Sequence, residues 1–214
     1  MRLLKRALAL EEEVTDGKAR NEIEFTYYGK LLDFSELLSA HSKEHQEQWQ
    51  VKLPMTPDNA GSGSIRIRKT IPDLVNTNLA KYVLTTKLKT GVNGKQIETS
   101  IDSSEDMFKA FQIISDGGMI KDRFIWTIPD SKLVWEFDVF YQLDAPVGSG
   151  KYHDWIKIDI EVPSKDTPIP PLPVRVVDLI VAQDGERTTE SEAIVRSLYD
   201  NQFLTKNQII HGKK

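Results

Sequence analysis

Charged residues of this sequence recur two positions apart, inside short runs in which every second residue is apolar. In residues 65–68, for example, Arg66 and Arg68 alternate with Ile65 and Ile67. Side chains at positions i and i+2 of a β-strand lie on the same face, so such a run predicts a strand with one charged and one apolar face. Five runs carry a like-charged pair of this kind: Glu22 and Glu24, Arg66 and Arg68, Lys87 and Lys89, Glu136 and Asp138, and Asp159 and Glu161.

These pairs indicate where the charge of the sheet lies. A single strand of this type is ordinarily half exposed, with its charged side in water. Across the five strands, however, two pairs are basic, three are acidic, and none mixes the two signs. If the strands belong to one sheet, its charged face has separate cationic and anionic zones. Arg123, with Phe124 and Trp126 on the other side of its strand, adds a further cation to that face.

The remaining pattern predicts a mostly antiparallel sheet. Strands with hairpin connections favour a sheet that closes, or nearly closes, on itself with helices outside. We therefore predict an α+β fold, an eight-stranded antiparallel β-barrel with helices packed outside it. Residues 1–19 are predicted to form an N-terminal helical extension, and residues 20–214 the barrel domain with a C-terminal helix at 189–199. The predicted strands cover residues 22–28, 49–53, 65–70, 82–90, 95–101, 119–128, 133–143 and 154–162.

Three segments between and after these strands have other patterns. The segment 31–46 predicts a helix, on whose solvated face His41 and His45 would lie four positions apart. The segment 103–118 predicts a second helix, with serine caps and acidic residues in its first turn. The segment 174–182 fits either a strand or a helix.

The composition excludes several classes of protein and of site. Hydrophobic residues make up 39% of the chain, and no run approaches the roughly 18 apolar residues that a membrane-spanning helix needs. The chain has no cysteine, which excludes thiol catalysis and cysteine-ligated metals, and its four histidines argue against a histidine-rich metal site. Its net charge of -4 does not favour a broadly basic nucleic-acid-binding surface. We predict a cytoplasmic protein that does not associate with a membrane.

A face that carries both signs of charge suits the binding of phosphate together with a metal. Arginine and lysine bind the oxygens of a polyphosphate, and clustered carboxylates are hard oxygen ligands for Mg²⁺ or Mn²⁺. An ion between them would neutralise phosphate charge and orient water for attack on phosphorus. The alternative, a plain barrel for apolar ligands, requires an apolar interior and conflicts with the charged pairs.

The order of these motifs resembles that of CYTH domains, members of the triphosphate tunnel metalloenzyme superfamily. The similarity covers residues 20–204, and it is carried by the shared order because each motif alone is weakly specific. The motifs are EIEF (22–25) for the ExExK signature, IRIR (65–68) for the RxR strand, LTTKLK (84–89) for the strand ending in lysine, KDRFIW (121–126) for the K/R-x-R strand, WEFDVF (135–140) for the ExD strand, IDIEV (158–162) for the late ExE strand and SLYDNQFL (197–204) for the tyrosine–asparagine segment.

The resemblance implies a tunnel in which a triphosphate is hydrolysed with the help of Mg²⁺ or Mn²⁺. Family members hydrolyse inorganic tripolyphosphate, nucleoside or RNA 5′-triphosphates, or thiamine triphosphate, and a minority cyclise ATP to cyclic AMP. The implied partner is therefore a small-molecule triphosphate or the 5′-triphosphate end of RNA.

The resemblance also implies a role for each paired charge. It implies catalytic roles for Glu22, Glu24, Arg66, Arg68, Lys87 and Arg123. The implied phosphate contacts are Arg66, Arg68, Lys87, Lys89 and Arg123. The implied metal ligands are Glu22, Glu24, Asp159 and Glu161, with help from Glu136 or Asp138.

The chain departs from the family pattern in its first motif. The signature lysine would fall at position 26, which is Thr26 here, and Lys30 lies further on, near the predicted strand end. Such a change is consistent with lower activity, another substrate, or binding without turnover. Three functions therefore stay open: hydrolysis of a triphosphate, binding of a polyphosphate or nucleotide without catalysis, and cyclisation of ATP.

Overall fold

The structure is a computed structural model of the chain, and it describes residues 23–53, 63–72, 77–89, 96–115, 117–141, 150–164 and 166–182. The predicted N-terminal extension, the C-terminal helix and Glu22 lie outside these residues. The described part is a mostly-β protein with nine strands, two short 3-10 helices and one α-helix. The strands are β1 (Ile23–Leu31), β2 (Ser42–Leu53), β3 (Gly63–Ile71), β4 (Lys81–Lys89), β5 (Gln96–Asp102), β6 (Gly117–Thr127), β7 (Val134–Tyr141), β8 (Tyr152–Val162) and β9 (Val176–Ala182), and the helices are η1 (Phe34–Ser39), η2 (Thr77–Leu79) and α2 (Glu105–Ile114).

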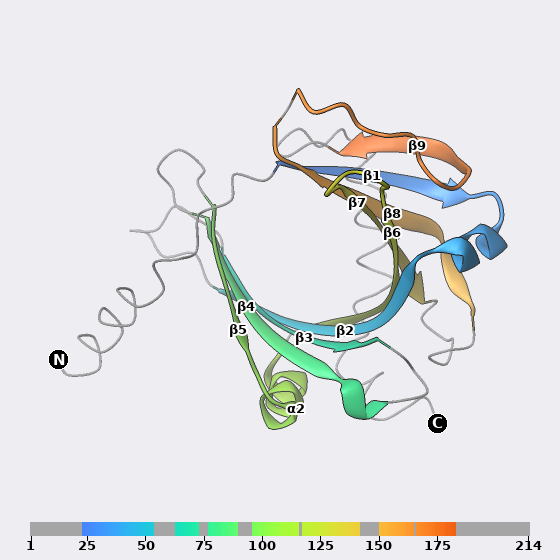
Figure 1. Cartoon of the computed structure of the whole chain (residues 1–214). Helices are drawn as coiled ribbons and strands as arrows, with labels where there is room; N and C mark the ends of the chain where they lie inside the picture. Colours follow the sequence, from blue (N-terminus) through green and yellow to red (C-terminus); the bar gives the residue numbers. More distant parts are fainter. Residues whose placement is uncertain are drawn as a thin grey trace.

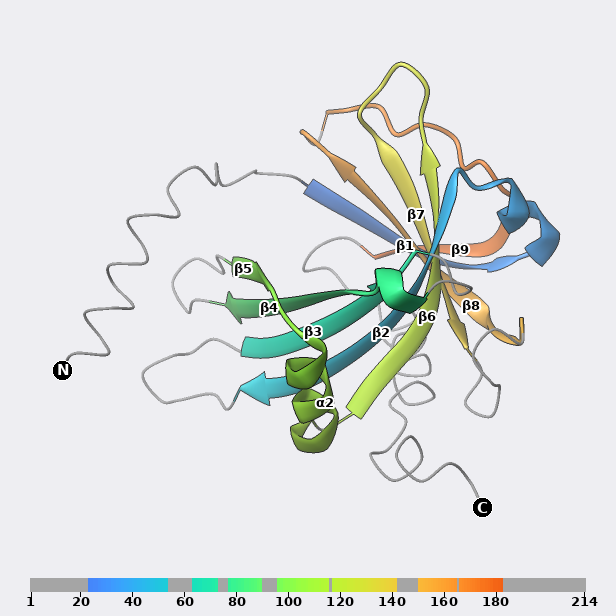
Figure 2. The same cartoon turned by 60° about the horizontal axis from the view of Figure 1, so that its bottom comes forward.

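The nine strands form one antiparallel sheet in the order β5-β4-β3-β2-β6-β7-β8-β1-β9. Its edges are β5 and β9, so the prediction of an eight-stranded closed barrel is wrong both in strand number and in closure. The sheet is instead strongly curved around a concave inner face (Figure 1, Figure 2). The physical reason lies in residues 174–182, whose sequence fits strand or helix equally well. Residues 176–182 of this segment form β9, which pairs with β1 and occupies the edge that closure onto β5 would need.

The helix predicted at 31–46 is also wrong for most of its length. Its middle forms η1, and its last residues begin β2, a central strand that pairs with both β3 and β6. Polar side chains on both faces of β2 hide the strand period in the sequence: Gln46 and Gln48 lie on one face and His45 on the other. His45 is 2% exposed, so it is enclosed in the sheet and does not lie on a solvated helix face.

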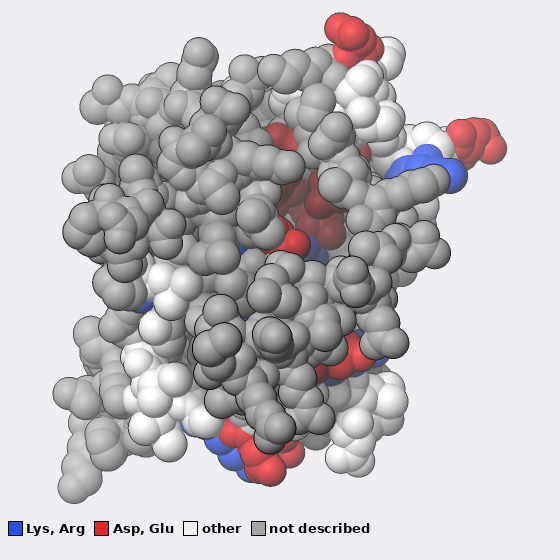
Figure 3. Space-filling model, turned by 90° about the vertical axis from the view of Figure 1, so that its left-hand side faces the viewer, with Lys and Arg blue, Asp and Glu red and all other residues white. Residues whose placement is uncertain are grey.

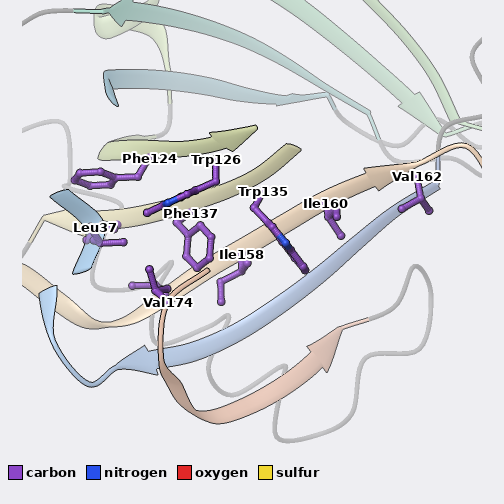
Figure 4. Packing of buried hydrophobic residues seen from close by; sticks show 11 residues of the cluster. Leu37, Phe124, Trp126, Trp135, Phe137, Ile158, Ile160, Val162 and Val174 are labelled. Carbon is purple, nitrogen blue, oxygen red and sulfur yellow. The ribbon is translucent and has the colours of Figure 1, made fainter. Parts of the chain in front are cut away.

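Most of the buried apolar residues of the strands lie on the outer face of the sheet, as their alternation predicts. The largest cluster covers β1, β6, β7 and β8 and is closed by Leu37 of η1 and by Val174, which precedes β9 (Figure 4). This core fixes the orientation of each strand, because a slip of one residue would turn every side chain to the opposite face. Its buried members include Phe124, Trp126, Trp135, Phe137, Val139, Ile156, Ile158, Ile160 and Val162.

A second outer cluster depends on α2, which confirms the helix predicted at 103–118 within shorter limits. Ser104 caps the helix by accepting a hydrogen bond in its first turn. Phe108 and Phe111, three positions apart, pack with Trp49 on the outer side of β2 and β3. Neither α2 nor any other helix in the described part of the chain is long and apolar enough to cross a membrane.

A buried carboxylate, Asp122 on β6, joins four strands on the outer face. Its Oδ1 accepts a hydrogen bond from His45 Nδ1 at 3.0 Å. Its Oδ2 accepts from the hydroxyls of Tyr141 at 2.9 Å and Tyr152 at 2.6 Å, and Lys43 Nζ lies 2.7 Å away. Burial by itself would raise the pKa of Asp122, but His45, Lys43 and Tyr152 hold it at about 2. One charge therefore ties β2, β6, β7 and β8 together.

We predict that Asp122→Ala lowers the free energy of unfolding by about 3 kcal/mol, because it leaves buried polar groups without their shared acceptor. Urea unfolding measures the effect. As a control, Asp154→Ala removes an exposed carboxylate of β8 and should change the unfolding free energy by less than about 0.5 kcal/mol. Equal effects of the two variants would contradict the prediction.

The same network predicts a dependence of stability on pH. The folded-state pKa of Asp122, about 2, lies below the ordinary 3.8. The stabilisation is therefore complete above that ordinary value and is lost as the pH falls toward 2. Urea unfolding between these pH values should show the difference between the wild type and Asp122→Ala shrinking with acid. A difference that stays constant would contradict it.

Candidate functional site

The inner face of the sheet holds a pocket of about 410 Å³. Figure 3 shows acidic and basic side chains within a hollow of the molecule on this side. Twelve of the sixteen lining residues are charged, six of each sign, and the lining comes from β1 to β8. Such a lining does not suit an apolar ligand. The residues are Glu24, Tyr28, Gln48, Arg66, Arg68, Lys87, Glu98, Met119, Lys121, Arg123, Glu136, Asp138, Phe140, Lys157, Asp159 and Glu161.

The structure brings together nine of the eleven residues that the sequence suggests for the site. Of the other two, Glu22 lies outside the described residues, and the side chain of Lys89 is also not described. The strand alternation therefore places acidic and basic pairs in one pocket, while their catalytic, phosphate-binding and metal-binding roles stay predictions. The nine are Glu24, Arg66, Arg68, Lys87, Arg123, Glu136, Asp138, Asp159 and Glu161.

A cationic zone, formed by Arg66 and Arg68 of β3 and Lys87 of β4, occupies one side of the pocket. Ile67, between the two arginines, is completely buried on the outer face, so both arginines must point inward. Glu98 of the edge strand β5 is the carboxylate of this zone. It lies 2.8 Å from Lys87 Nζ and 3.7 Å from Arg66 Nη2.

Arg68 is the least satisfied cation of this zone. Its Nε is buried and has no hydrogen-bond partner among the described residues. Burial, reinforced by the positive charges of Arg66 and Arg123, lowers the pKa of Arg68 to about 10. With this pKa the guanidinium group of Arg68 stays protonated at neutral pH. Because a buried charged donor without a partner is costly, this is where the pocket most needs an anion.

Asp138 lies at the centre of the pocket, between two cations of β6. It is 1% exposed, and it accepts hydrogen bonds from Arg123 Nε at 2.7 Å and Nη2 at 2.9 Å. Lys121 Nζ contacts the same carboxylate, and Arg123 also contacts Glu136. Burial alone would raise the pKa of Asp138, but Lys121 and Arg123 hold it far below its usual range.

An anionic zone, formed by Glu24 of β1 with Asp159 and Glu161 of β8, occupies the other side of the pocket. Glu24 lies directly opposite Glu161 in the sheet, and Thr26 lies opposite Asp159. Thr26 Oγ1 donates a hydrogen bond of 2.7 Å to Asp159 Oδ1. Thr26, at the position where the resemblance leads us to expect a lysine, is therefore an uncharged partner of this zone.

Lys157 of β8 supplies the positive charge of the anionic zone. Its Nζ contacts Asp159 Oδ2 and lies 3.4 Å from Glu24 Oε1. Burial would lower the pKa of Lys157, but Asp159, Asp138 and Glu24 raise it above its usual value. For Asp159, burial raises the pKa and the charges of Glu24 and Asp138 add to this, against the opposing effect of Lys157.

The described residues do not form a metal centre. No three carboxylate or imidazole groups among them lie close enough together to hold an ion. Their oxygens contact cations of the protein instead: Asp138 contacts Lys121 and Arg123, and Asp159 contacts Lys157. The carboxylates are chemically suited to Mg²⁺ or Mn²⁺, but their arrangement is not, and the metal stays a prediction of the resemblance.

Two cations of the pocket were visible in the sequence but received no role there. Lys121 lies two positions before Arg123, and Lys157 two positions before Asp159, so the alternation places both on the inner face. Lys30, in contrast, does not line the pocket. Its Nζ bonds Asp178 of β9 at 2.9 Å.

Glu98 and Gln48 are further lining residues without a predicted role. In the predicted strand 95–101, Glu98 was visible as the one acidic residue, in alternation with Gln96 and Ser100. Gln48 lies in β2, whose beginning was predicted as a helix, so no inward face could be assigned to it.

An apolar cluster closes one end of the inner face. Tyr28, Met119 and Phe140 are buried together there, with Trp155 and Ile180 packed against them. The first three also line the pocket. They are the apolar part of a lining that is otherwise polar or charged.

Comparisons with known proteins give no family. No protein-family model matches the chain, and no curated protein is significantly similar to it. Among solved structures, the chain is similar to the PH1819 protein from Pyrococcus horikoshii OT3, at 16% identity over 83% of this chain and 86% of that chain, with a TM-score of 0.37. A similarity this distant carries no conclusion about function.

The surroundings of two lysines in the pocket predict that their pKa values shift in opposite directions. Burial lowers the pKa of Lys121 to about 7, whereas that of Lys157 is raised. In ¹³C NMR of chains labelled at lysine Cε, one resonance should titrate near neutral pH and disappear in Lys121→Arg. A second should show no change until strongly alkaline pH and disappear in Lys157→Met. Two lysines that titrate together would contradict this prediction.

Proposed function

We propose that this pocket binds a ligand that carries a triphosphate group. The observation that carries the proposal is the cationic zone, where the buried Nε of Arg68 has no partner among the described residues. Guanidinium groups bind phosphate oxygens through paired, charge-assisted hydrogen bonds. A phosphate group bound there would supply the missing acceptor and relieve the repulsion between Arg66 and Arg68.

The spread of charge supports a chain of phosphates rather than a single one. Cations line the pocket from β3, β4, β6 and β8, so different strands can contact successive phosphate groups. Lys121, Arg123 and Lys157 already contact carboxylates of the protein. In the cationic zone, Lys87 and Arg66 share the single carboxylate of Glu98. Arg68, whose buried Nε has no partner among the described residues, is therefore the primary anchor. Inorganic tripolyphosphate, nucleoside triphosphates, thiamine triphosphate and the 5′ end of RNA all carry the required group.

Hydrolysis of the bound triphosphate is the second candidate function. The resemblance to CYTH domains favours it, and so does the position of the anionic zone across the same pocket from the cationic zone. In this reaction Arg66, Arg68 and Lys87 would hold phosphate oxygens and stabilise the negative charge that develops on them. Because the described carboxylates form no metal centre, we assign no step to a protein-bound ion.

Phosphate release distinguishes these candidates. The wild type is incubated with tripolyphosphate, ATP, thiamine triphosphate or 5′-triphosphate RNA, with Mg²⁺ or Mn²⁺. Release from any of them supports hydrolysis, and cyclic AMP formed from ATP supports cyclisation. Calorimetric binding without either product identifies a binding module. Neither binding nor turnover with any of the four ligands would overturn the proposal.

We predict that the double variant Arg66→Ala, Arg68→Ala weakens tripolyphosphate binding by more than about 100-fold. Each charge-assisted hydrogen bond contributes about 1.5–3 kcal/mol, and the variant removes at least two. Isothermal titration calorimetry measures the affinity, and circular dichroism checks the fold.

Lys30→Ala provides the matched control, because it removes a cation of β1 that is bound to Asp178 outside the pocket. Its affinity for tripolyphosphate should equal that of the wild type. If the double variant also binds normally, the two arginines do not hold the ligand and the proposed site is wrong.

A further inference from the structure

The ammonium group of Lys157 lies among the carboxylates of three neighbouring strands. On its own strand, β8, the ammonium group contacts Asp159. It also lies 3.4 Å from Oε1 of Glu24, on the neighbouring strand β1. On β7, Asp138 is the residue directly opposite Lys157 in the sheet. The side chain of Lys157 is only 26% exposed, so its charge is directed into the pocket and away from bulk water.

We infer that Lys157 fills the cation position of the anionic zone in place of a divalent metal ion. The pocket then binds its ligand without a protein-bound metal, a consequence that rests on the proposed binding of a triphosphate. The protein would thus carry within its own chain the positive charge that hard-metal sites take from solution.

The contacts of Lys157 explain why a metal ion would be excluded. A divalent ion between Glu24 and Asp159 needs the oxygens that the ammonium group now contacts. It would also lie next to a second positive charge in a poorly solvated place, where like charges repel strongly. Thr26 occupies the other oxygen of Asp159 through its 2.7 Å hydrogen bond. Both oxygens of this carboxylate therefore already have donors within the protein.

The carboxylate of Asp138 is occupied by donors of the protein in the same way. Both oxygens of Asp138 accept from Arg123, and Lys121 shares one of them. Neither Asp138 nor Asp159 thus retains an oxygen that lacks a cation or hydroxyl. The cationic zone, with its unpartnered Arg68 Nε, is consequently where an incoming ligand gains most.

Manganese binding to the protein alone tests the role of Lys157. Mn²⁺ is titrated into the full chain without any phosphate ligand, and free ion is followed by electron paramagnetic resonance. The wild type should bind no Mn²⁺ tightly, while Lys157→Met, which removes the charge and keeps an unbranched side chain, should bind at least about tenfold more tightly because the like charge is gone. Tight binding by the wild type, or no gain in a folded Lys157→Met, would overturn the inference.

Lys81→Met is the matched control, because it makes the same substitution at an exposed position of β4 that does not line the pocket. It should bind Mn²⁺ as the wild type does. A gain equal to that of Lys157→Met would show that the ion binds to the surface generally, and would overturn the inference.

A second measurement uses only the wild type and so does not depend on the folding of a variant. Tripolyphosphate is titrated calorimetrically in EDTA and in Mg²⁺, with the affinity corrected for the free ligand. Binding in EDTA that is within about tenfold of that in Mg²⁺ supports the inference, and binding that requires Mg²⁺ overturns it. Absence of binding in both buffers overturns the proposed function instead, and the manganese titration still decides the role of Lys157.

Discussion

The carboxylate of Asp138 is the interaction on which the inner face of the sheet depends. It is 1% exposed and holds Lys121 and Arg123 side by side on β6. Two buried cations this close together are tolerated only because a fully desolvated negative charge lies between them. Through Arg123 the same group positions Glu136, and on the neighbouring strand it lies opposite Lys157. The charges on both sides of the pocket are therefore linked through one residue.

This arrangement places charge where an ordinary sheet would place its core. The apolar sides of β1, β6, β7 and β8 face outward and are covered by η1 and the segment before β9, while α2 covers β2 and β3. Curvature of the sheet encloses the opposite face, so its charges must be neutralised by each other or by a ligand. Most are neutralised by each other, but the buried Nε of Arg68 is a donor that has no partner among the described residues. The balance explains how a chain of small net charge can have a strongly polar pocket.

Much of the pocket could be predicted because side-chain direction in a strand is a local property. Arg66, Arg68, Glu136 and Asp138 needed only the alternation with apolar neighbours. The first part of β2 was predicted as a helix because this strand carries polar residues on both faces. One of them is His45, which contacts Asp122 on β6, 77 positions away in the sequence. No local pattern shows that such a histidine is buried. The prediction of a closed barrel failed for a related reason, because the pairing of β9 with β1 is a contact between distant segments.

The sequence by itself determined which side chains face inward, since the period of two residues is set by the backbone of each strand. It thereby placed Lys157 on the same face as Asp159 and Glu161. Only the tertiary structure decided that β8 lies between β1 and β7, and hence that the ammonium group of Lys157 lies among Glu24, Asp138 and Asp159. Strand order also left the sheet open at β5 and β9. The physical reason is that the direction of a side chain depends on neighbours one or two residues away, whereas its charge partners depend on which strands pair.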